Sequence, residues 1–211
     1  MYKSNHVSIV GPLLLVLLTL QHGFGQECSP PTTIDGTLNK LICDQPVFYT
    51  ILPKTEESVL LDNVCLTYFP LPDDPNTAML YISSVYCDGS NSIQSTIISS
   101  IGRGSFRSAN PMSTMSYYVF GYAGCDTFLG YVCSDYGASS PPYVVGASSS
   151  CRPIGLSCLR KVEEIISNAG VPEQDMYILP MKLPNRCVTQ QACILPPNPF
   201  YNSLGPSVGL Y

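Results

Sequence analysis

The ten cysteines of this sequence are the residues with the clearest chemistry. Their number is even, and in an exported chain such cysteines usually pair as disulfides. Metal binding is not favoured, because no two cysteines have the C-x-x-C spacing and both histidines, His6 and His22, lie near the N-terminus. Beyond residue 25 there is no histidine. The usual general base of Ser-His-Asp and Cys-His catalysis is therefore missing.

Residues 1–25 have the pattern of a secretory signal peptide. Lys3 supplies a positive start, Ile9–Leu20 is an apolar run, and residues 23–25 (GFG) offer the small side chains of a cleavage site. The apolar run is shorter than the ~20 residues of a membrane-spanning helix. We expect cleavage after Gly25 and a secreted, extracellular mature chain without a membrane span.

The charge balance limits the kinds of partner. The chain carries 10 basic and 15 acidic residues, and residues 1–25 contain one of the bases and none of the acids. Nucleic acids and anionic membrane surfaces are bound by clustered Lys and Arg, and this sequence has no such cluster. We therefore exclude nucleic acid as a partner. The sequence leaves open whether the chain forms a homo-oligomer.

Short runs rich in β-branched and aromatic residues recur along the chain and are separated by turn residues. The stretch between the fourth and fifth of these runs, Gly102–Met115, is short and predicts a stunted additional strand, with a turn at Gly102-Arg103-Gly104. Such spacing is typical of a sandwich or barrel of antiparallel strands. The runs are Pro46–Leu52, Val64–Leu71, Met79–Tyr86, Ile93–Ile101, Ser116–Tyr122, Thr127–Ser134 and Tyr143–Ala147.

One segment has helical periodicity. In Leu156–Ala169, apolar residues recur at three- and four-residue steps with charged residues between them, which predicts an amphipathic helix of about four turns. Gly170 suits the position after the helix, and Pro172 prevents the helix from resuming. We expect one domain over residues 26–194 and a flexible tail over residues 195–211, which are rich in Pro, Asn, Ser and Gly.

This order of elements, a series of strands followed by one late helix, resembles the lipocalins. The resemblance is greatest to the branch of apolipoprotein D, the insect bilin-binding proteins and the crustacean carotenoid-binding proteins. It implies an all-β fold, an eight-stranded up-and-down antiparallel barrel with the helix packed outside. The matching segments are the Cys-Ser-Pro-Pro at Cys28, residues 47–51 (VFYTI), 65–69 (CLTYF), 117–120 (YYVF), 128–133 (FLGYVC), 143–145 (YVV) and 170–172 (GVP).

The resemblance also implies two disulfides, Cys28–Cys133 and Cys65–Cys187. The family's Gly-x-Trp motif is missing because the chain has no tryptophan, and Phe48 stands in its place at the expected base of the barrel. Among the other cysteines, Cys151 and Cys158 are close enough in sequence for a local disulfide. Three pairings remain open for the last four, which are Cys43, Cys87, Cys125 and Cys193.

A barrel of this size holds one small ligand, so the resemblance implies a carrier rather than an enzyme. The 14 tyrosines suit a mostly hydrophobic ligand such as a bilin, carotenoid, retinoid, sterol or fatty acid. No metal and no cofactor are predicted apart from a pigment or lipid held as that ligand. From the register of the family, we expect four aromatic residues in the pocket wall: Tyr68, Phe120, Tyr131 and Tyr143.

Two other classes of function stay open. A cysteine-rich secreted chain with few charges is also typical of a structural protein of an extracellular matrix, in which the barrel would hold no ligand. An enzyme acting on its ligand would require a nucleophile, and a free cysteine inside the barrel could serve as one.

Overall fold

The computed structural model describes residues 28–36, 46–110, 113–134 and 141–188. The predicted signal peptide and the predicted tail at residues 195–211 lie outside these residues. The helices and strands are β1 (Val47–Pro53), η1 (Ser58–Leu60), β2 (Leu61–Leu71), β3 (Asp74–Tyr86), β4 (Asn91–Gly102), β5 (Ser105–Asn110), β6 (Ser113–Tyr122), β7 (Thr127–Ser134), β8 (Tyr143–Ser148), α3 (Leu156–Asn168) and β9 (Met176–Ile178).

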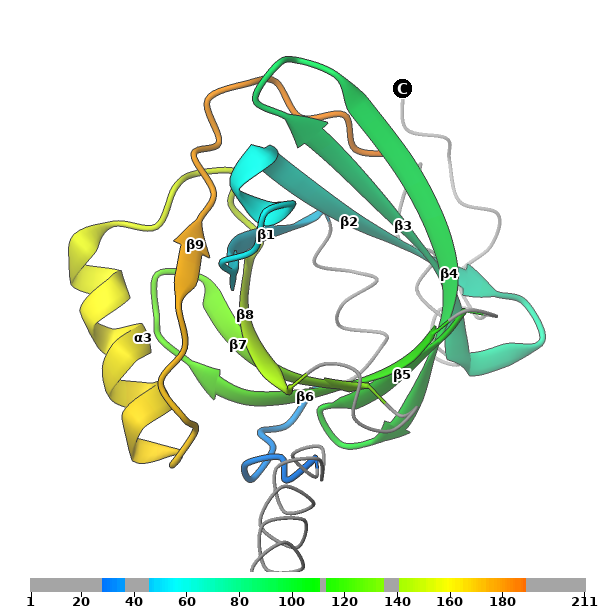
Figure 1. Ribbon diagram of the computed structural model, residues 1–211. Coiled ribbons are helices and arrows are strands. Elements are labelled where there is room, and N and C mark those ends of the chain that lie inside the picture. Colours follow the sequence, from blue (N-terminus) through cyan, green and yellow to red (C-terminus); the bar gives the residue numbers. More distant parts are fainter. Residues whose placement is uncertain (1–27, 37–45, 111–112, 135–140, 189–211) are drawn as a thin grey trace, which may run out of the picture.

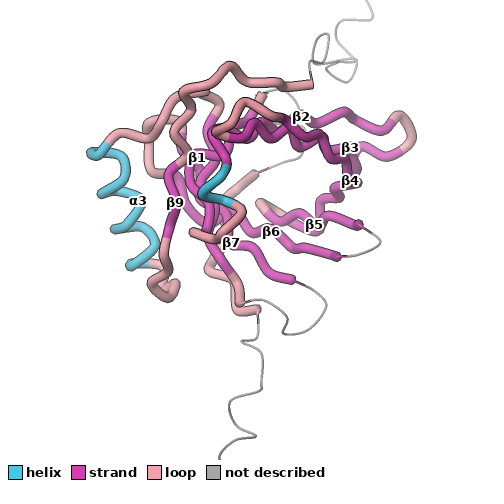
Figure 2. Tube along the Cα trace, turned by 45° about the horizontal axis from the view of Figure 1, so that its top comes forward, coloured by secondary structure: helices cyan, strands magenta, loops and turns pink. Residues whose placement is uncertain are grey.

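The sheet closes on itself into an eight-stranded antiparallel barrel, which confirms the predicted fold class. The strands β2 to β8 pair in chain order, each with its neighbour in sequence. Strand β1 pairs with both β8 and β2 and so closes the ring. Closure removes the exposed edges that an open sheet would present. The short β9 pairs with the C-terminal half of β1, and α3 lies outside the ring (Figure 1). In the tilted view, α3 stands against one side of the wall (Figure 2).

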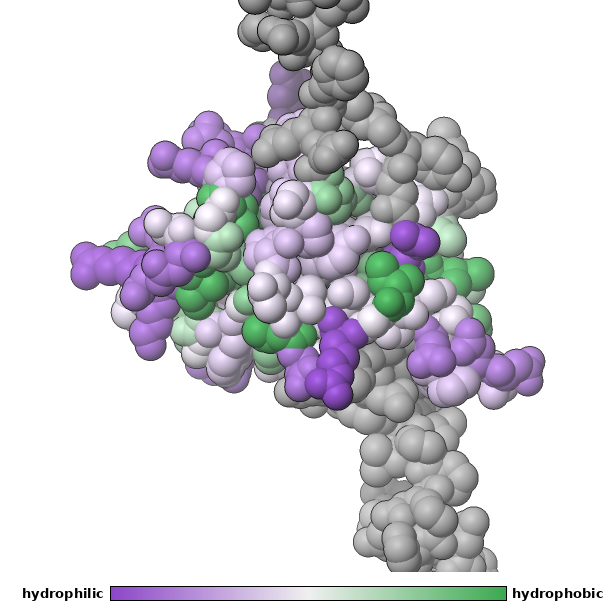
Figure 3. Space-filling view, turned by 90° about the horizontal axis from the view of Figure 1, so that it is seen from below, coloured by the Kyte–Doolittle hydropathy of each residue, from purple (hydrophilic) through white to green (hydrophobic). Residues whose placement is uncertain are grey.

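Strand alternation divides the apolar residues of the barrel into two clusters. The inner cluster contains Val47, Leu66 and Leu80 and lies on the inward face of the strands. The outer cluster lies between the wall and α3, and it contains Leu129 and Val162. In the view of Figure 3, hydrophobic residues form only small separate patches on the surface. The two clusters of buried apolar residues thus lie inside the barrel and under the helix.

The predicted helix is confirmed. On α3, Val162 and Ile166 of the predicted apolar stripe are buried against the wall together with Cys158, whereas Leu156 at the start of the helix is exposed. Gly170 adopts a φ of +67°, a left-handed conformation that glycine accepts without steric cost. Close packing of α3 also requires a glycine on β6, because a Cβ atom at Gly121 would lie 2.7 Å from Cγ2 of Ile165.

The disulfides confirm two of the three predicted pairs and correct the third. Cys28–Cys133 and Cys65–Cys187 form as the resemblance implied. The predicted Cys151–Cys158 pair is wrong. Cys158 faces the wall from the buried side of α3, where Cys125 in the β6–β7 turn lies with its Cα 6.4 Å away.

The three pairing schemes left open for Cys43, Cys87, Cys125 and Cys193 are also wrong. Each of them pairs Cys125 with one of the other three, whereas Cys125 is bonded to Cys158. Cys87 and Cys151 are free thiols, the first exposed and the second half-buried. Cys43 and Cys193 lie outside the described residues. No helix among the described residues is long and apolar enough to cross a membrane.

Candidate functional site

A cavity of about 480 Å³ occupies the interior of the barrel. This volume is in the range of pockets that bind small molecules. Residues from every barrel strand line it, because alternate side chains of each strand point inward. The lining is mainly apolar, and includes Val47, Tyr49, Leu66, Tyr68, Leu80, Ile98, Phe106, Tyr117, Val119, Phe128, Val145 and Ala147.

Four tyrosines form a cluster inside the barrel: Tyr49 on β1, Tyr68 on β2, Tyr117 on β6 and Tyr143 on β8. Burial raises the pKa of the Tyr49 hydroxyl well above its usual value, and the nearby Tyr117, Tyr68 and Tyr143 add to this rise. Burial also raises the pKa of Tyr68 and of Tyr143, with a further contribution from Tyr117 in each case. The four phenols therefore stay neutral across the physiological pH range.

Tyr117 has a hydroxyl partner within the wall. Burial raises its pKa, while a hydrogen bond with the Ser108 side chain lowers it in part. Ser108 lies on β5, next to β6 in the sheet. The interior thus combines a wide apolar surface with a few hydroxyls, an arrangement that orients a mostly hydrophobic molecule.

The N-terminal segment, residues 28–36, is fastened at one end of the barrel, here called the N-terminal end. The Ile34 amide donates to the carbonyl of Val119 at 2.8 Å, and the Gly104 amide donates to the carbonyl of Gly36 at 2.9 Å. Gly104 has a φ of +60°, and a Cβ atom there would collide with the carbonyl oxygen of Ile34. Glycine is therefore required for this close approach.

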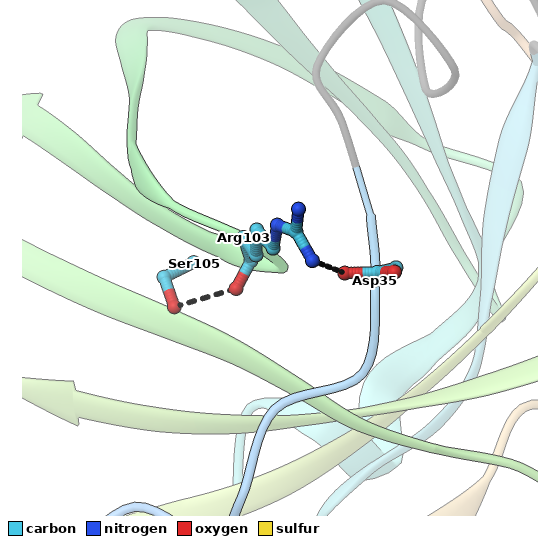
Figure 4. A network of polar contacts seen from close by, with 3 residues as sticks. All are labelled: Asp35, Arg103 and Ser105. Carbon is cyan, nitrogen blue, oxygen red and sulfur yellow. Dashed lines mark hydrogen bonds and ion pairs between the residues drawn. The ribbon is translucent and has the colours of Figure 1, made fainter.

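The β4–β5 turn adds a charged contact to this attachment. The Arg103 guanidinium points toward Asp35 of the N-terminal segment, with 3.5 Å between Nη1 and Oδ1, and the Ser105 hydroxyl donates to the Arg103 carbonyl (Figure 4). Both charged side chains are highly exposed, so the ion pair adds little to stability. Its effect is to place Arg103 beside an acid at the rim of the cavity.

Of the four aromatic residues expected in the pocket wall, two are on the inward face. Tyr68 lines the cavity, and Tyr143 shares the inward face of β8 with Val145 and Ala147. Phe120 and Tyr131 belong to the outer cluster under α3. The inward residues are instead Tyr117 and Val119 on β6, and Phe128 and Gly130 on β7.

Phe48 also lies elsewhere than expected. It is buried, with 3% of its surface exposed, but it pairs with Cys65 and Ser148 on the face of β1 opposite to Val47 and Tyr49. It is not among the residues that line the cavity. Residues 47–51 thus have the expected place in the first strand, while the buried Phe48 lies on the face of β1 that points away from the cavity.

Two tyrosines of the interior, Tyr49 and Tyr117, were not among the predicted pocket residues. A signal for Tyr49 exists in the sequence, because it alternates with Val47; Ile51 does not continue this alternation, since the register shifts after Tyr49 and Ile51 belongs to the outer cluster. The corresponding signal on β6 is ambiguous, since Tyr117 and Tyr118 are adjacent and identical in type. Only the pairing of the strands decides which of them faces inward.

A second hollow has a volume of about 520 Å³. Its lining comes from the end of β1, the start of β8 and residues 171–175, and it includes both Tyr131 and the inward-facing Tyr143. Gln174 is fixed there by the Val144 amide, which donates to its Oε1 at 3.1 Å. Among the described residues, no group of three or more His, Cys, Asp or Glu side chains could hold a metal ion.

Comparison with known proteins supports the architecture. No family model and no curated protein matches the sequence. Among solved structures, the siderocalin Ex-FABP aligns with a TM-score of 0.50 and 9% identity, over 67% of this chain and 97% of that one. An odorant-binding protein aligns with a TM-score of 0.51 and 8% identity, over 72% and 99% of the two chains. The chain has the lipocalin fold.

At such low identity, the likeness concerns the lipocalin fold alone. Lobster apocrustacyanin A1 is 12% identical, with a TM-score of 0.48 over 72% of this chain and 91% of that one. That score carries no argument about the branch of lipocalins, so the branch expected from the sequence stays a prediction.

Proposed function

We propose that this protein is a secreted carrier that binds a small hydrophobic molecule inside its barrel. The observation that carries the proposal is the cavity of about 480 Å³, which is lined mainly by apolar and tyrosine side chains. The lipocalin fold and the name of one structural neighbour, an odorant-binding protein, are in line with this function. Bilins, carotenoids, retinoids, sterols and fatty acids are the candidate classes of ligand.

Secretion is part of the proposal. Three disulfides join the described residues, and disulfides persist mainly in oxidising compartments outside the cytosol. Two of them connect positions more than a hundred residues apart, so the stability of the barrel depends on an oxidised state. The pattern of residues 1–25 supports export independently.

The cavity favours binding over catalysis. An enzyme working in the barrel would use a nucleophile there, and the free thiols of the described chain are in other places. Cys87 lies in the β3–β4 turn and Cys151 in the connection between β8 and α3, and neither lines the cavity.

The direct test is to purify the full secreted chain from its native source and extract it with organic solvent. We expect a small hydrophobic molecule in the absorption and mass spectra of the extract. Protein depleted of this molecule should show quenched tyrosine fluorescence when retinoids, sterols, fatty acids or bilins are added. An empty extract together with no response to any of these compounds would refute the proposal.

A pair of matched variants locates the binding site. Ala147 lines the cavity, whereas Ala109 is an exposed alanine on β5. Ala147→Phe should fill part of the cavity and abolish binding, and Ala109→Phe should leave binding unchanged. Circular dichroism of both variants reports whether the barrel has folded. Equal binding by two folded variants would place the ligand outside the barrel.

A further inference from the structure

The described residues that line the cavity offer no positive charge to a ligand. Among the described residues that line the cavity, the only charged ones are Asp35 and Asp126, both at the N-terminal end. Neither of the two arginines nearest in sequence to the lining residue Phe106 lines the cavity. Arg103 pairs with Asp35, and Arg107 is exposed on the face of β5 opposite to Phe106. An anionic group on a ligand would therefore meet no cationic partner among these described residues.

The same interior offers phenol groups to a ligand. Tyr49 lines the cavity, and the half-buried Tyr143 lies close to it on the inward face of β8. A ligand group that forms a hydrogen bond with such a phenol gains affinity. A phenol can donate to a carbonyl and can either donate to or accept from an alcohol.

The environment of the phenols also opposes negative charge. Burial raises the pKa of Tyr49 because a phenolate there would lose its hydration without gaining a counter-ion. A ligand carboxylate in the same place would pay the same loss of hydration. Neutral hydroxyl and carbonyl groups carry no such penalty.

We infer that the cavity selects neutral apolar molecules that carry a hydroxyl or carbonyl group, and that it discriminates against carboxylates and sulfates. This inference rests on the proposed function and narrows it. Sterols, retinol-like alcohols and oxygenated carotenoids fit the description, whereas fatty acids and bilins, which bear ionised carboxylates, do not.

Two matched ligand pairs test the selection on the full, disulfide-bonded chain. Retinol is compared with retinoate, and cholesterol with cholesteryl sulfate, by displacement of a neutral naphthylamine dye at neutral pH. Within each pair the apolar body is the same, so the difference reports the charged group. We expect the neutral member to bind at least about 10-fold more tightly.

The outcomes separate the inference from the proposed function. If retinoate or cholesteryl sulfate binds as tightly as its neutral counterpart, the selection for neutral ligands is wrong while the carrier function stands. If the dye and all four ligands fail to bind, the carrier function itself is wrong, and the inference falls with it.

A tyrosine variant tests the role of the hydroxyls. Tyr49→Phe removes one phenol hydroxyl from the cavity lining and should weaken retinol binding by about 2- to 10-fold, the value of one hydrogen bond. Its affinity for a hydrocarbon analogue without oxygen should not change. Tyr118→Phe is the matched control, because Tyr118 packs in the outer cluster. Equal loss for retinol and the hydrocarbon, or an equal effect of the two variants, would overturn the role of Tyr49.

Discussion

The buried tyrosine cluster predicts that the barrel unfolds at alkaline pH. The pKa of Tyr49, Tyr68, Tyr117 and Tyr143 is raised in the folded protein, mainly by burial. In the unfolded chain these phenols ionise near pH ~10. Between the two values the unfolded chain has lost protons that the folded chain still holds. The stability is complete below pH ~10 and falls as the pH rises further.

The magnitude follows from the number of linked protons. Each tyrosine that stays protonated only in the folded state lowers the free energy of unfolding by about 1.4 kcal/mol per pH unit. Four such groups together give a slope of up to about 5 kcal/mol per pH unit. A typical domain has a total stability of about 5–15 kcal/mol. The barrel should therefore unfold within about one to three pH units above the pKa of a free phenol.

Two measurements check this prediction. Phenolate absorbance in the near ultraviolet is not masked by tryptophan, because the chain has none. We expect one group of tyrosines to ionise first, and a second group to ionise together with the loss of the β-sheet signal in circular dichroism. The free energy of unfolding, measured in urea at several pH values, gives the slope directly. Short exposure times are needed, since disulfides exchange at high pH.

Variants make the prediction specific to the cluster. Tyr49→Phe should reduce the slope by about 1.4 kcal/mol per pH unit and move the alkaline transition to higher pH. Tyr122→Phe, at an exposed ring, should leave both unchanged. The reasoning would be refuted if all tyrosines ionised in one step near pH ~10 while the barrel remained folded.

Three further predictions concern the wall and its cysteines. Gly104→Ala should destabilise the protein by about 1–3 kcal/mol in urea unfolding, because alanine must adopt a positive φ and collide with the Ile34 carbonyl; an unchanged midpoint would contradict this. Replacing Cys125 and Cys158 together by alanine opens a loop of 33 residues, and we expect a loss of about 3–4 kcal/mol by calorimetry. A thiol reagent should modify Cys87 in the native protein without denaturant, and peptide mapping would show the site; protection of this thiol would contradict its exposure.

The fold was largely predictable because its signals are local. Each predicted run overlaps a strand, and the short stretch after residue 102 contains β5, the six-residue strand Ser105–Asn110. The helix begins at Leu156 as the periodicity indicated and ends at Asn168, with Ala169 as its cap. Alternation and turn residues act over a few positions, so the sequence displays them directly.

The inward face of the strands was harder to predict, and β6 shows why. Tyr117 faces the cavity and Phe120 faces α3, so both sides of this strand are buried in apolar surroundings. Hydropathy then no longer alternates, and the period-two signal for inside and outside is lost. The register also shifts between Val119 and Gly121, which alters the alternation near the end of the strand.

The Cys125–Cys158 bond could not be predicted from the sequence for a different reason. Cys151 is much nearer to Cys158 in sequence, but sequence distance does not measure where side chains point. The buried face of α3 directs Cys158 toward the β6–β7 turn, whereas Cys151 lies before the helix begins, with its Sγ 3.7 Å from the Asn185 side chain. The pairing depends on the docking of α3, which is a tertiary property.

The side chains inside the barrel leave a cavity, so part of the packing that stabilises the barrel lies outside the cavity, under α3. The cavity of about 480 Å³ replaces the closely packed core that a closed barrel of this size would otherwise contain. Two features stabilise the barrel from outside the cavity: the cluster under α3 and the long-range disulfides. Because both lie outside the cavity, the inward residues can be chosen for a ligand rather than for close packing.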